Sequence, residues 1–495
     1  MACILSMKQG GAGLTQHTFY WHDYETWGAN PSVDRPSQFA GVRTDAGLNV
    51  IGEPLMLYSR PAPDYLPHPE ACLITGLTPQ HVLEEGVPEA EFIARIHHEL
   101  SQPGTCGVGY NSIRFDDEVT RFTLYRNFYD PYAREWQNGN SRWDLIDVVR
   151  LCRALRPDGI QWPVREDGTP SFKLERLTQT NGLSHDAAHD ALSDVYATIA
   201  LAKLIREKQP RLFEYALGLR FKHAVAAQLN LVTQAPVLHV SGRIPAARFC
   251  SALVMPLMAH PTNRNSVIVY DLSTDPAPLL QGSVEEIQRR VFSRAAELEE
   301  NDETRIPLKE IHINRAPVVA TVKLVDDAVA ARLHLDMDAC RRHWQQLRDA
   351  GETLRGRLKQ VFSAREFAEQ NDPDSMLYSG GFFSDADRQL MNRLRETPPA
   401  ELARQSFPFE DRRLPEMLWR YRARNYPETL SPQELDDWRQ FCAERLREAD
   451  PARLSLTSFR ERLSALAAGV EDDKGRFILQ ELSEYADDLE AALSG

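Results

Sequence analysis

The stretch TFYWHDYE, residues 18–25, is rich in aromatic side chains and predicts a buried strand near the start of the chain. Asp23 and Glu25 are two residues apart, so a strand projects both carboxylates from the same face. Two carboxylates in one space repel each other unless a cation or a proton lies between them. The pair alone does not decide a function, because solvated acids at a strand edge have the same spacing.

Two further segments place acids next to predicted helices. In NSIRFD, residues 111–116, a strand gives way to a helix, and Asp116 there also suits the positive end of a helix dipole. In AHDALSDVYATIA, residues 188–200, His189 falls in the first turn of a predicted helix and Asp194 lies one turn further. A capping histidine followed by an exposed acid gives the same pattern, so each segment taken singly stays ambiguous.

The chain of 495 residues has room for about three domains. Residues 1–16 are expected to be a loose tail, and residues 17–210 alternate strands with helices, which predicts an α/β unit. Residues 211–360 predict a smaller, mostly β-containing domain with helices at its end. Residues 361–495 predict an almost entirely helical domain with loops at residues 378–388 and 421–434.

Composition and charge narrow the class of protein. With 42% hydrophobic and 26% charged residues the chain is ordinary for a globular protein, and no apolar run approaches the ~20 residues of a membrane span. The seven cysteines are scattered singly, which predicts free thiols in a reducing compartment, and we expect a cytoplasmic protein. The net charge of −14 at first argues against a nucleic-acid partner. Basic residues nevertheless outnumber acidic ones within residues 211–360, and binding depends on where charges lie.

Taken in order, the three acidic segments resemble the DEDD exonuclease superfamily, and His189 marks its DEDDh branch. The connecting sequence is similar to the bacterial exodeoxyribonuclease I family from about His17 to near the C-terminus. The segments that carry this likeness are HDYETWG, DRPSQFAGVRTD, LITGLTP, GYNSIRFDDEVTRFTLYRNFYDPYAREW, SRWDLIDVV, ALRPDGIQWP, GFFSDADR and YRARNYPETL.

The resemblance implies a ribonuclease-H-like exonuclease domain with a mixed sheet, then an SH3-like domain and an α-helical C-terminal domain, together enclosing a DNA channel. It implies degradation of single-stranded DNA in the 3′→5′ direction, with release of nucleoside 5′-monophosphates, in DNA repair and recombination. It also implies a monomer that binds the C-terminal tail of single-stranded DNA-binding protein. Arg156 and Tyr215 are the expected contacts to that tail.

By the family pattern, two Mg²⁺ ions (or Mn²⁺) are held by Asp23, Glu25, Asp116 and Asp194, with Asp23 between them. His189 is expected to take the proton from the attacking water. We interpret His185 as a bystander, and Asp117 and Glu118 as ordinary acids of a helix start.

The run from Phe115 to Trp143 interleaves cations with aromatic side chains, which is typical of single-strand binding, although buried aromatics give the same pattern. Family similarity favours as substrate-binding positions Glu25, Arg121, Tyr132, Trp136, Arg150, Lys173 and, in the basic middle domain, Arg264. Lys173 stands where the family often has an arginine. A lysine keeps the positive charge but lacks the two-pronged guanidinium that binds a phosphate through two hydrogen bonds.

Two alternatives remain open. The first is a DEDDh-type 3′→5′ exoribonuclease or a proofreading exonuclease, although such catalytic cores can be far shorter. The second is a catalytically inactive DNA-repair binding module, which the filled set of five site positions disfavours.

Overall fold

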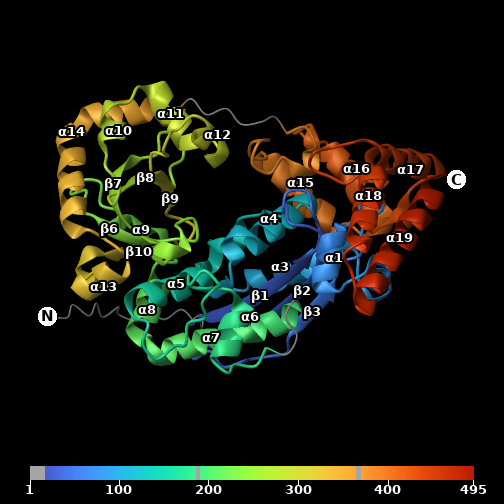
Figure 1. The fold of residues 1–495 in the computed structure, drawn as a ribbon. Helices are drawn as coiled ribbons and strands as arrows, with labels where there is room; N and C mark the ends of the chain where they lie inside the picture. The colour runs from blue at the N-terminus through green and yellow to red at the C-terminus, as the bar shows by residue number, and fades with distance from the viewer. Residues whose placement is uncertain (1–16, 186–189, 364–369, 495) are drawn as a thin grey trace, which may run out of the picture.

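The computed structural model describes residues 17–185, 190–363 and 370–494, which form three parts arranged side by side (Figure 1). The first part carries a five-stranded mixed sheet of order β3-β2-β1-β4-β5. Its strands are β1 (Thr18–Thr26), β2 (Pro36–Thr44), β3 (Leu55–Tyr58), β4 (Thr105–Gly109) and β5 (Ser141–Asp144). β1 runs antiparallel to β2 and parallel to β4, which confirms the predicted mixed sheet.

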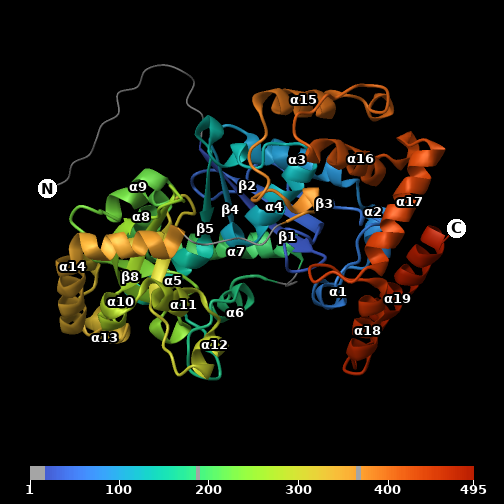
Figure 2. The same ribbon diagram turned by 90° about the horizontal axis from the view of Figure 1, so that it is seen from above.

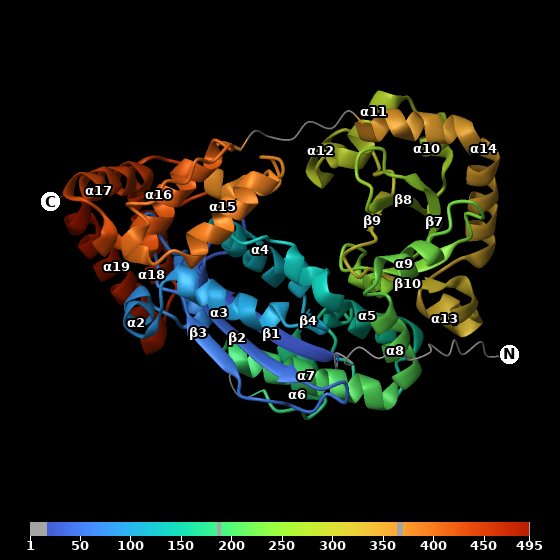
Figure 3. The same ribbon diagram turned by 180° about the vertical axis from the view of Figure 1, so that it is seen from behind.

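Helices cover both faces of this sheet. α3 and α4 lie on one side, and α6 and α7 lie on the other (Figures 1 and 3). The helices of this part are α1 (Pro69–Thr75), α2 (Pro79–Glu85), α3 (Glu89–Ser101), α4 (Asp116–Arg126), α5 (Leu145–Leu155), α6 (Leu174–Thr180), α7 (Ala191–Lys208) and α8 (Pro210–Gly218). The next helix, α9 (Lys222–Gln228), packs through Val225 against strands of the second part and belongs with them. Short 3₁₀ turns occur at η1 (Ser112–Arg114), η2 (Ala133–Glu135) and η3 (Gln137–Gly139).

The second part is built on an antiparallel sheet of order β10-β6-β7-β8-β9, as the predicted β-containing domain requires. Its strands are β6 (Val237–Val240), β7 (Ser251–Ala259), β8 (Ser266–Asp271), β9 (Leu308–His312) and β10 (Val318–Thr321). Its helices are α10 (Ala277–Gln281), α11 (Val284–Phe292), α12 (Ala295–Glu300), α13 (Asp327–Arg332) and α14 (Met337–Ser363), with 3₁₀ turns η4 (Ala246–Arg248) and η5 (Val322–Leu324). α14 bends at Gly351, whose φ of 48° suits a residue without a side chain.

The third part is helical, as predicted. It contains α15 (Asp385–Glu396), α16 (Arg413–Asn425), α17 (Pro432–Arg447), α18 (Leu456–Ala467) and α19 (Asp473–Ser494), and the 3₁₀ turns η6 (Pro373–Ser375), η7 (Pro399–Glu401) and η8 (Pro427–Thr429). The loop predicted over residues 421–434 is wrong at both ends. Residues 421–425 continue α16, where Tyr421 and Ala423 pack in apolar clusters, and α17 begins at Pro432.

Apolar and ionic contacts join the three parts. Leu145 and Val148 of α5 share one cluster with Leu238 and Val318 of the second sheet. On the other side, Phe122 and Tyr125 of α4 pack with Met391 and Leu414 of the helical part, which lies at the opposite end of the molecule from α14 (Figure 2). The first part therefore forms the centre of the molecule, with a flanking part on each side.

A buried ionic network reinforces the second of these junctions. Arg424 of α16 donates to Asp64 of the first part at 2.7 Å and to Asp374 of η6 at 2.7 Å. Arg35 lies within 4.0 Å of both carboxylates.

The six cysteines among the described residues are free, as predicted, and all six are buried; Cys3 lies outside those residues. No helix in the described ranges has the length and apolar character that crossing a bilayer requires.

Candidate active site

The end of β1 positions the first two acids. The pairing of β1 with β4 ends at Trp21 and Val108, so Asp23 and Glu25 project beyond the edge of the neighbouring parallel strand. Single oxygen atoms of Asp23, Glu25 and Asp194 all lie within 4.8 Å of one another. That separation places three carboxylates around one point where a divalent cation would fit.

The short connection between β4 and α4 places Asp116, the fourth predicted acid, next to the end of β1. Asn111 takes a left-handed conformation with φ of 67°, and Asp116 opens α4 directly after the η1 turn. The Oδ1 atom of Asp116 accepts a hydrogen bond at 3.0 Å from the backbone N–H of Tyr24, the residue between Asp23 and Glu25. This bond fixes Asp116 against β1, so the three segments that were ambiguous singly meet at one site.

The start of α7 positions Asp194 and shows a role for His185. Asp190 caps α7 by accepting from the N–H of Ser193 at 3.1 Å, so the helix begins at Ala191, two residues later than predicted, and Asp194 lies in its first turn. His185 Nε2 lies 2.5 Å from Asp194 Oδ1, and His185 Nδ1 lies 3.1 Å from Thr178 Oγ1.

The interpretation of His185 as a bystander is therefore wrong, because the ring holds one of the site carboxylates. His189, the predicted proton acceptor, lies outside the described residues.

Burial, reinforced by repulsion between neighbouring carboxylates, raises the pKa values of the cluster. Burial, followed by the charges of Asp116 and Glu25, raises the pKa of Asp23 well above its ordinary range. Burial and the Asp194 carboxylate raise the pKa of Glu25 to about 8, and burial raises the pKa of Asp116 to about 8. These carboxylates repel one another without a cation, so the donor set fits divalent metal ions that prefer oxygen ligands.

Asp117 and Glu118 are not the ordinary helix-start acids that the sequence suggested. Asp117 is buried and accepts from Arg134 at 2.6 Å and from Arg142 at 3.0 Å. Burial works to raise the pKa of Asp117, but these two arginines outweigh it and hold that pKa below its usual value. Asp117 therefore ties the start of α4 to these two arginines. Glu118 forms an ion pair with Arg121 at 2.8 Å.

The carboxylates open into a cavity of about 750 Å³ between the first sheet and the second part. Asp23, Glu25, Asp194 and His185 form its acidic end. Its other charged lining residues include the cations Arg150, Arg165, Lys173 and Arg243. A cavity with carboxylates at one end and cations around it suits a polyanion whose reacting phosphate must approach bound metal.

Comparison with known proteins agrees with this geometry. Residues 20–202 match the family model described as exonuclease, residues 220–364 the exonuclease I SH3-like domain, and residues 371–489 the exonuclease I C-terminal domain. Exodeoxyribonuclease I of Escherichia coli K12 is 45% identical over 479 residues, which cover 96% of this chain and 99% of the relative. This chain belongs to the exodeoxyribonuclease I family.

Other members of the exodeoxyribonuclease I family extend the agreement. The Haemophilus influenzae enzyme is 44% identical and covers 94% of this chain and 98% of its own length. A solved exonuclease I from Methylocaldum szegediense superposes with a TM-score of 0.91 at 49% identity, over 96% of this chain and all of that one. Escherichia coli exonuclease I in complex with a dA16 oligonucleotide gives 0.92 at 44% identity, over 96% of this chain and all of that one. The fold and the enzyme class predicted from the sequence are confirmed.

Two of the predicted substrate-binding cations line the active-site cavity. Arg150 lies there with its guanidinium 2.6 Å from Asp147 and over the ring of Phe172. Lys173 is exposed at the start of α6 and lies 3.5 Å from Glu175.

Arg121, Tyr132 and Trp136 lie outside that cavity. Arg121 is buried, and its guanidinium donates to Glu135 and Glu118. Tyr132 lies against the Arg121 guanidinium. Tyr132 and Trp136 line a separate cavity of about 530 Å³, and the Trp136 side chain is 65% exposed. Arg264 is exposed in the loop between β7 and β8.

The predicted tail-binding residues lie at the end of α5 and on α8. Arg156 caps the C-terminus of α5 and is exposed, with its guanidinium on the Leu155 carbonyl at 2.6 Å. The hydroxyl of Tyr215 on α8 donates to the Val319 carbonyl of β10 at 2.7 Å. No feature of the fold tests their role.

Sequence reasoning missed Arg165 and Arg243 in addition to His185. Arg165 lies on the loop before α6, and Arg243 lies on the loop before β7. Neither residue belongs to a motif. Each is a cation in a segment that nearby glycine and proline residues predict to be a loop, and the sequence gives no other signal for them.

Proposed function

We propose that this protein degrades single-stranded DNA from its 3′ end, with Mg²⁺ ions bound at Asp23, Glu25, Asp116 and Asp194, and releases nucleoside 5′-monophosphates. The observation that carries the proposal is the meeting of three carboxylates within 4.8 Å at the acidic end of a cation-lined cavity. The relatives named exodeoxyribonuclease I, and the relative solved with a dA16 oligonucleotide, support the choice of DNA as substrate.

The residues of the site have three roles in this reaction: binding metal, orienting the metal ligands, and moving the proton of the attacking water. When bound, two divalent cations would stabilise negative charge on the attacking and leaving oxygens and lower the pKa of a bound water. The Tyr24 N–H holds Asp116 in place, and His185 holds Asp194, so the ligand oxygens are oriented before substrate arrives. His189 takes the proton of the attacking water, and the cations along the cavity neutralise the phosphates of the strand.

The test is digestion of strands labelled at the 3′ or the 5′ end, with Mg²⁺, Mn²⁺ or EDTA. We expect immediate release of the 3′ label as mononucleotide from single-stranded DNA, with either metal and not with EDTA. The matched control is Asp194→Asn, which keeps the side-chain shape and removes the charge. Full activity of Asp194→Asn, or release of the 5′ label first, would overturn the proposal.

The exoribonuclease alternative has one observation in its favour. The oligoribonuclease of Alkalilimnicola ehrlichii is 27% identical over 199 residues, which cover 38% of this chain. That likeness covers little more than a third of the chain, whereas the exonuclease I models also match residues 220–364 and 371–489. RNA strands in the same assay decide between the two substrates, and faster digestion of RNA than of DNA would favour the alternative.

Three further properties belong to the same proposal. We propose that the enzyme acts as a monomer in the cytoplasm, in DNA repair and recombination. We also propose that Arg156 and Tyr215 bind the C-terminal tail of single-stranded DNA-binding protein, because Arg156 offers an exposed cation at the end of α5 and Tyr215 lies where α8 meets β10. Titration with the tail peptide tests this contact. Equal affinity of wild type and Arg156→Ala would contradict it, and light scattering gives the oligomeric state.

A further inference from the structure

The connection between β4 and α4 packs closely against the strand that carries Asp23. β4 ends at Gly109, and the connection continues through the η1 turn to Asp116. A Cβ atom at Gly109 would lie 2.6 Å from the Cβ of Ser112 and 3.0 Å from the His22 carbonyl oxygen of β1, so only glycine allows this approach. The backbone shape of the connection therefore decides where the Asp116 carboxylate lies.

One buried carboxylate holds this connection from the neighbouring strand. Asp144 is the last residue of β5 and pairs with Gly109 in the sheet. Its Oδ1 atom accepts a hydrogen bond from the backbone N–H of Asn111 at 2.8 Å, and its Oδ2 atom accepts one from that of Ile113 at 3.2 Å. Oδ1 also accepts from the N–H of Ile146 at 3.1 Å, which caps α5. Asp144 thus fastens the connection to the start of α5.

The hydrogen bonds of Asp144 stabilise a backbone shape that costs conformational energy. Asn111 has a φ of 67°, in the left-handed region that residues other than glycine rarely adopt. Asp144 binds the N–H of this residue and the N–H two residues further, one on each side of Ser112. The left-handed step is therefore held from outside the connection, and loss of the carboxylate would allow it to relax.

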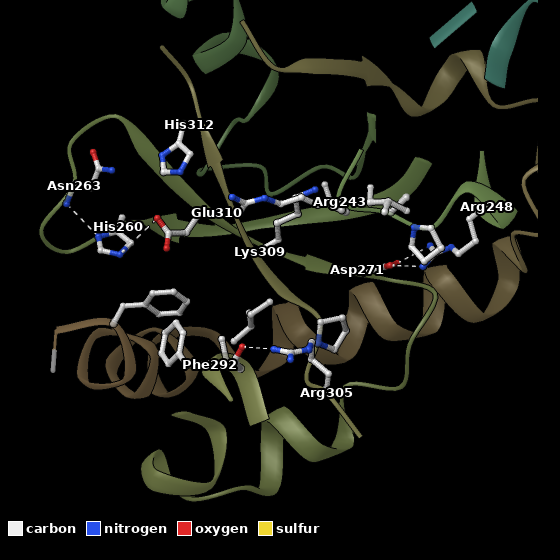
Figure 4. A pocket seen from close by; sticks show the side chains of 18 of the residues that line it. Arg243, Arg248, His260, Asn263, Asp271, Phe292, Arg305, Lys309, Glu310 and His312 are labelled. Carbon is white, nitrogen blue, oxygen red and sulfur yellow. Dashed lines mark hydrogen bonds and ion pairs between the residues drawn. The ribbon is translucent and has the colours of Figure 1, made fainter. Parts of the chain in front are cut away.

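The partners of Asp144 explain why a carboxylate occupies this place. Asp271 in the second part faces the Arg248 guanidinium at 2.7 Å (Figure 4), whereas Asp144 forms no ion pair with any described residue. Burial, and then the charge of Asp147, raise the pKa of Asp144 to about 7, and its hydrogen bonds to backbone N–H groups act against that rise. A hydroxyl or an amide would cap α5 without this cost, but either has a single acceptor oxygen, and two carboxylate oxygens suit three donors.

The hold on the connection extends to the metal centre through the backbone. Asp116 follows Ile113 by three residues, and its Oδ1 atom lies 3.0 Å from the N–H of Tyr24 on β1. Metal affinity depends on groups that orient the ligands as well as on the ligands themselves. We propose that Asp144 is a positioning residue of the nuclease, which keeps Asp116 within reach of the metal ions by holding the connection between β4 and α4.

The test measures Mn²⁺ affinity by electron paramagnetic resonance and, separately, kcat and KM for a single-stranded oligodeoxythymidylate. The first variant is Asp144→Asn, which keeps the side-chain shape but replaces one acceptor oxygen with an amide group that only donates. The second variant is Asp144→Ser. Its hydroxyl can still cap α5, so the helix keeps its start, but one oxygen cannot serve the two N–H groups of the connection as well.

The matched control is Asp387→Asn in α15 of the third part. Asp387 is also buried, and its carboxylate also holds a separate loop by accepting from the backbone N–H groups of Glu410 at 2.8 Å and Asp411 at 3.1 Å. This variant therefore removes the same kind of contact, from a loop that carries no metal ligand.

Both Asp144 variants should lose about 10–100-fold in Mn²⁺ affinity, and kcat at low Mn²⁺ should fall by a similar factor. Raising the Mn²⁺ concentration should recover part of the activity. KM for the strand should stay near that of wild type, because the described residues that line the active-site cavity do not include Asp144. Asp387→Asn should lower the thermal midpoint and leave both Mn²⁺ affinity and kcat unchanged.

Wild-type Mn²⁺ affinity and kcat in the folded Asp144 variants would overturn the inference, whatever their thermal midpoints, because Asp144 would then only cap α5. Equal losses of Mn²⁺ affinity in Asp387→Asn would also overturn it, since general destabilisation would explain them. The inference rests on the proposed function, but the two fail differently. Absence of Mn²⁺ binding and cleavage in wild type refutes the proposed function, whereas equal binding by wild type and the Asp144 variants refutes only the role of Asp144.

Discussion

Replacing Glu25 with glutamine removes one of the charges that repel one another in the metal-free active site, and it should make the metal-free protein more stable. The pKa of Glu25 is raised from 4.5 to about 8. Since one pKa unit corresponds to about 1.4 kcal/mol, the ionised side chain destabilises the folded state by about 3 kcal/mol at pH 7. Burial of the charged carboxylate is the larger cause and repulsion by Asp194 the next, and a buried glutamine amide keeps part of the burial cost, so the substitution should recover about 1–3 kcal/mol.

The sign of the pH dependence follows from the same shift. An acid whose pKa is raised by folding is protonated in both the folded and the unfolded state below about pH 4.5, and there it does not change the free energy of unfolding. Its destabilising effect grows as the pH rises and is complete above about pH 8. Glu25→Gln should therefore raise the thermal midpoint in EDTA at pH 8 by about 2 °C or more, and by less at pH 5.

Calorimetry in EDTA and in Mg²⁺ measures both effects. Wild type should gain stability from Mg²⁺ by mass action, and Glu25→Gln should gain less and lose cleavage. The control is Glu84→Gln, an exposed acid of α2, whose midpoint should not change. A lower midpoint for Glu25→Gln in EDTA at pH 8 would refute the reasoning, because it would mean that the ionised carboxylate stabilises the metal-free fold.

Three other predictions concern the junctions and the aromatic cavity. Arg424→Met leaves Asp64 and Asp374 buried with less compensation, so the free energy of unfolding in urea should fall by about 3–5 kcal/mol; a fall below about 1 kcal/mol would contradict this. Burial raises the pKa of Glu89, but Arg126 and Arg35 outweigh it and lower that pKa to about 2. Its stabilising contribution should therefore be complete above about pH 4.5 and disappear as the pH falls to about 2. Urea midpoints of wild type should drop over this range more than those of Glu89→Gln. Trp136→Ala removes an exposed ring, so stability should not change while single-strand affinity falls by about 1–3 kcal/mol, measured by fluorescence anisotropy; unchanged affinity would remove Trp136 from the DNA path.

The fold, and the meeting of Asp23, Glu25 and Asp194 at one point, could be predicted because they follow from the spacing of residues within each segment and from the order of the segments. The spacing of Asp23 and Glu25 sets a common strand face, and the breaks at Asn111 and before Ala191 mark where strands and helices begin. Each of these signals lies within one element, where sequence spacing determines direction.

The errors concern contacts between elements. Asp117 looks like a helix-start acid in sequence, but its partners Arg134 and Arg142 come from the chain beyond α4, and only packing brings them together. His185 was set aside for lying outside the motif, yet the turn after α6 carries its ring to Asp194.

The most direct test of the account is a count of the divalent cations that the carboxylate cluster binds, by electron paramagnetic resonance titration with Mn²⁺. Wild type should bind two ions per chain, and Asp23→Asn, which removes the acid placed between them, should bind at most one and lose cleavage. Two ions retained by Asp23→Asn, or none bound by wild type, would contradict the claim that these carboxylates form the metal centre of the exonuclease.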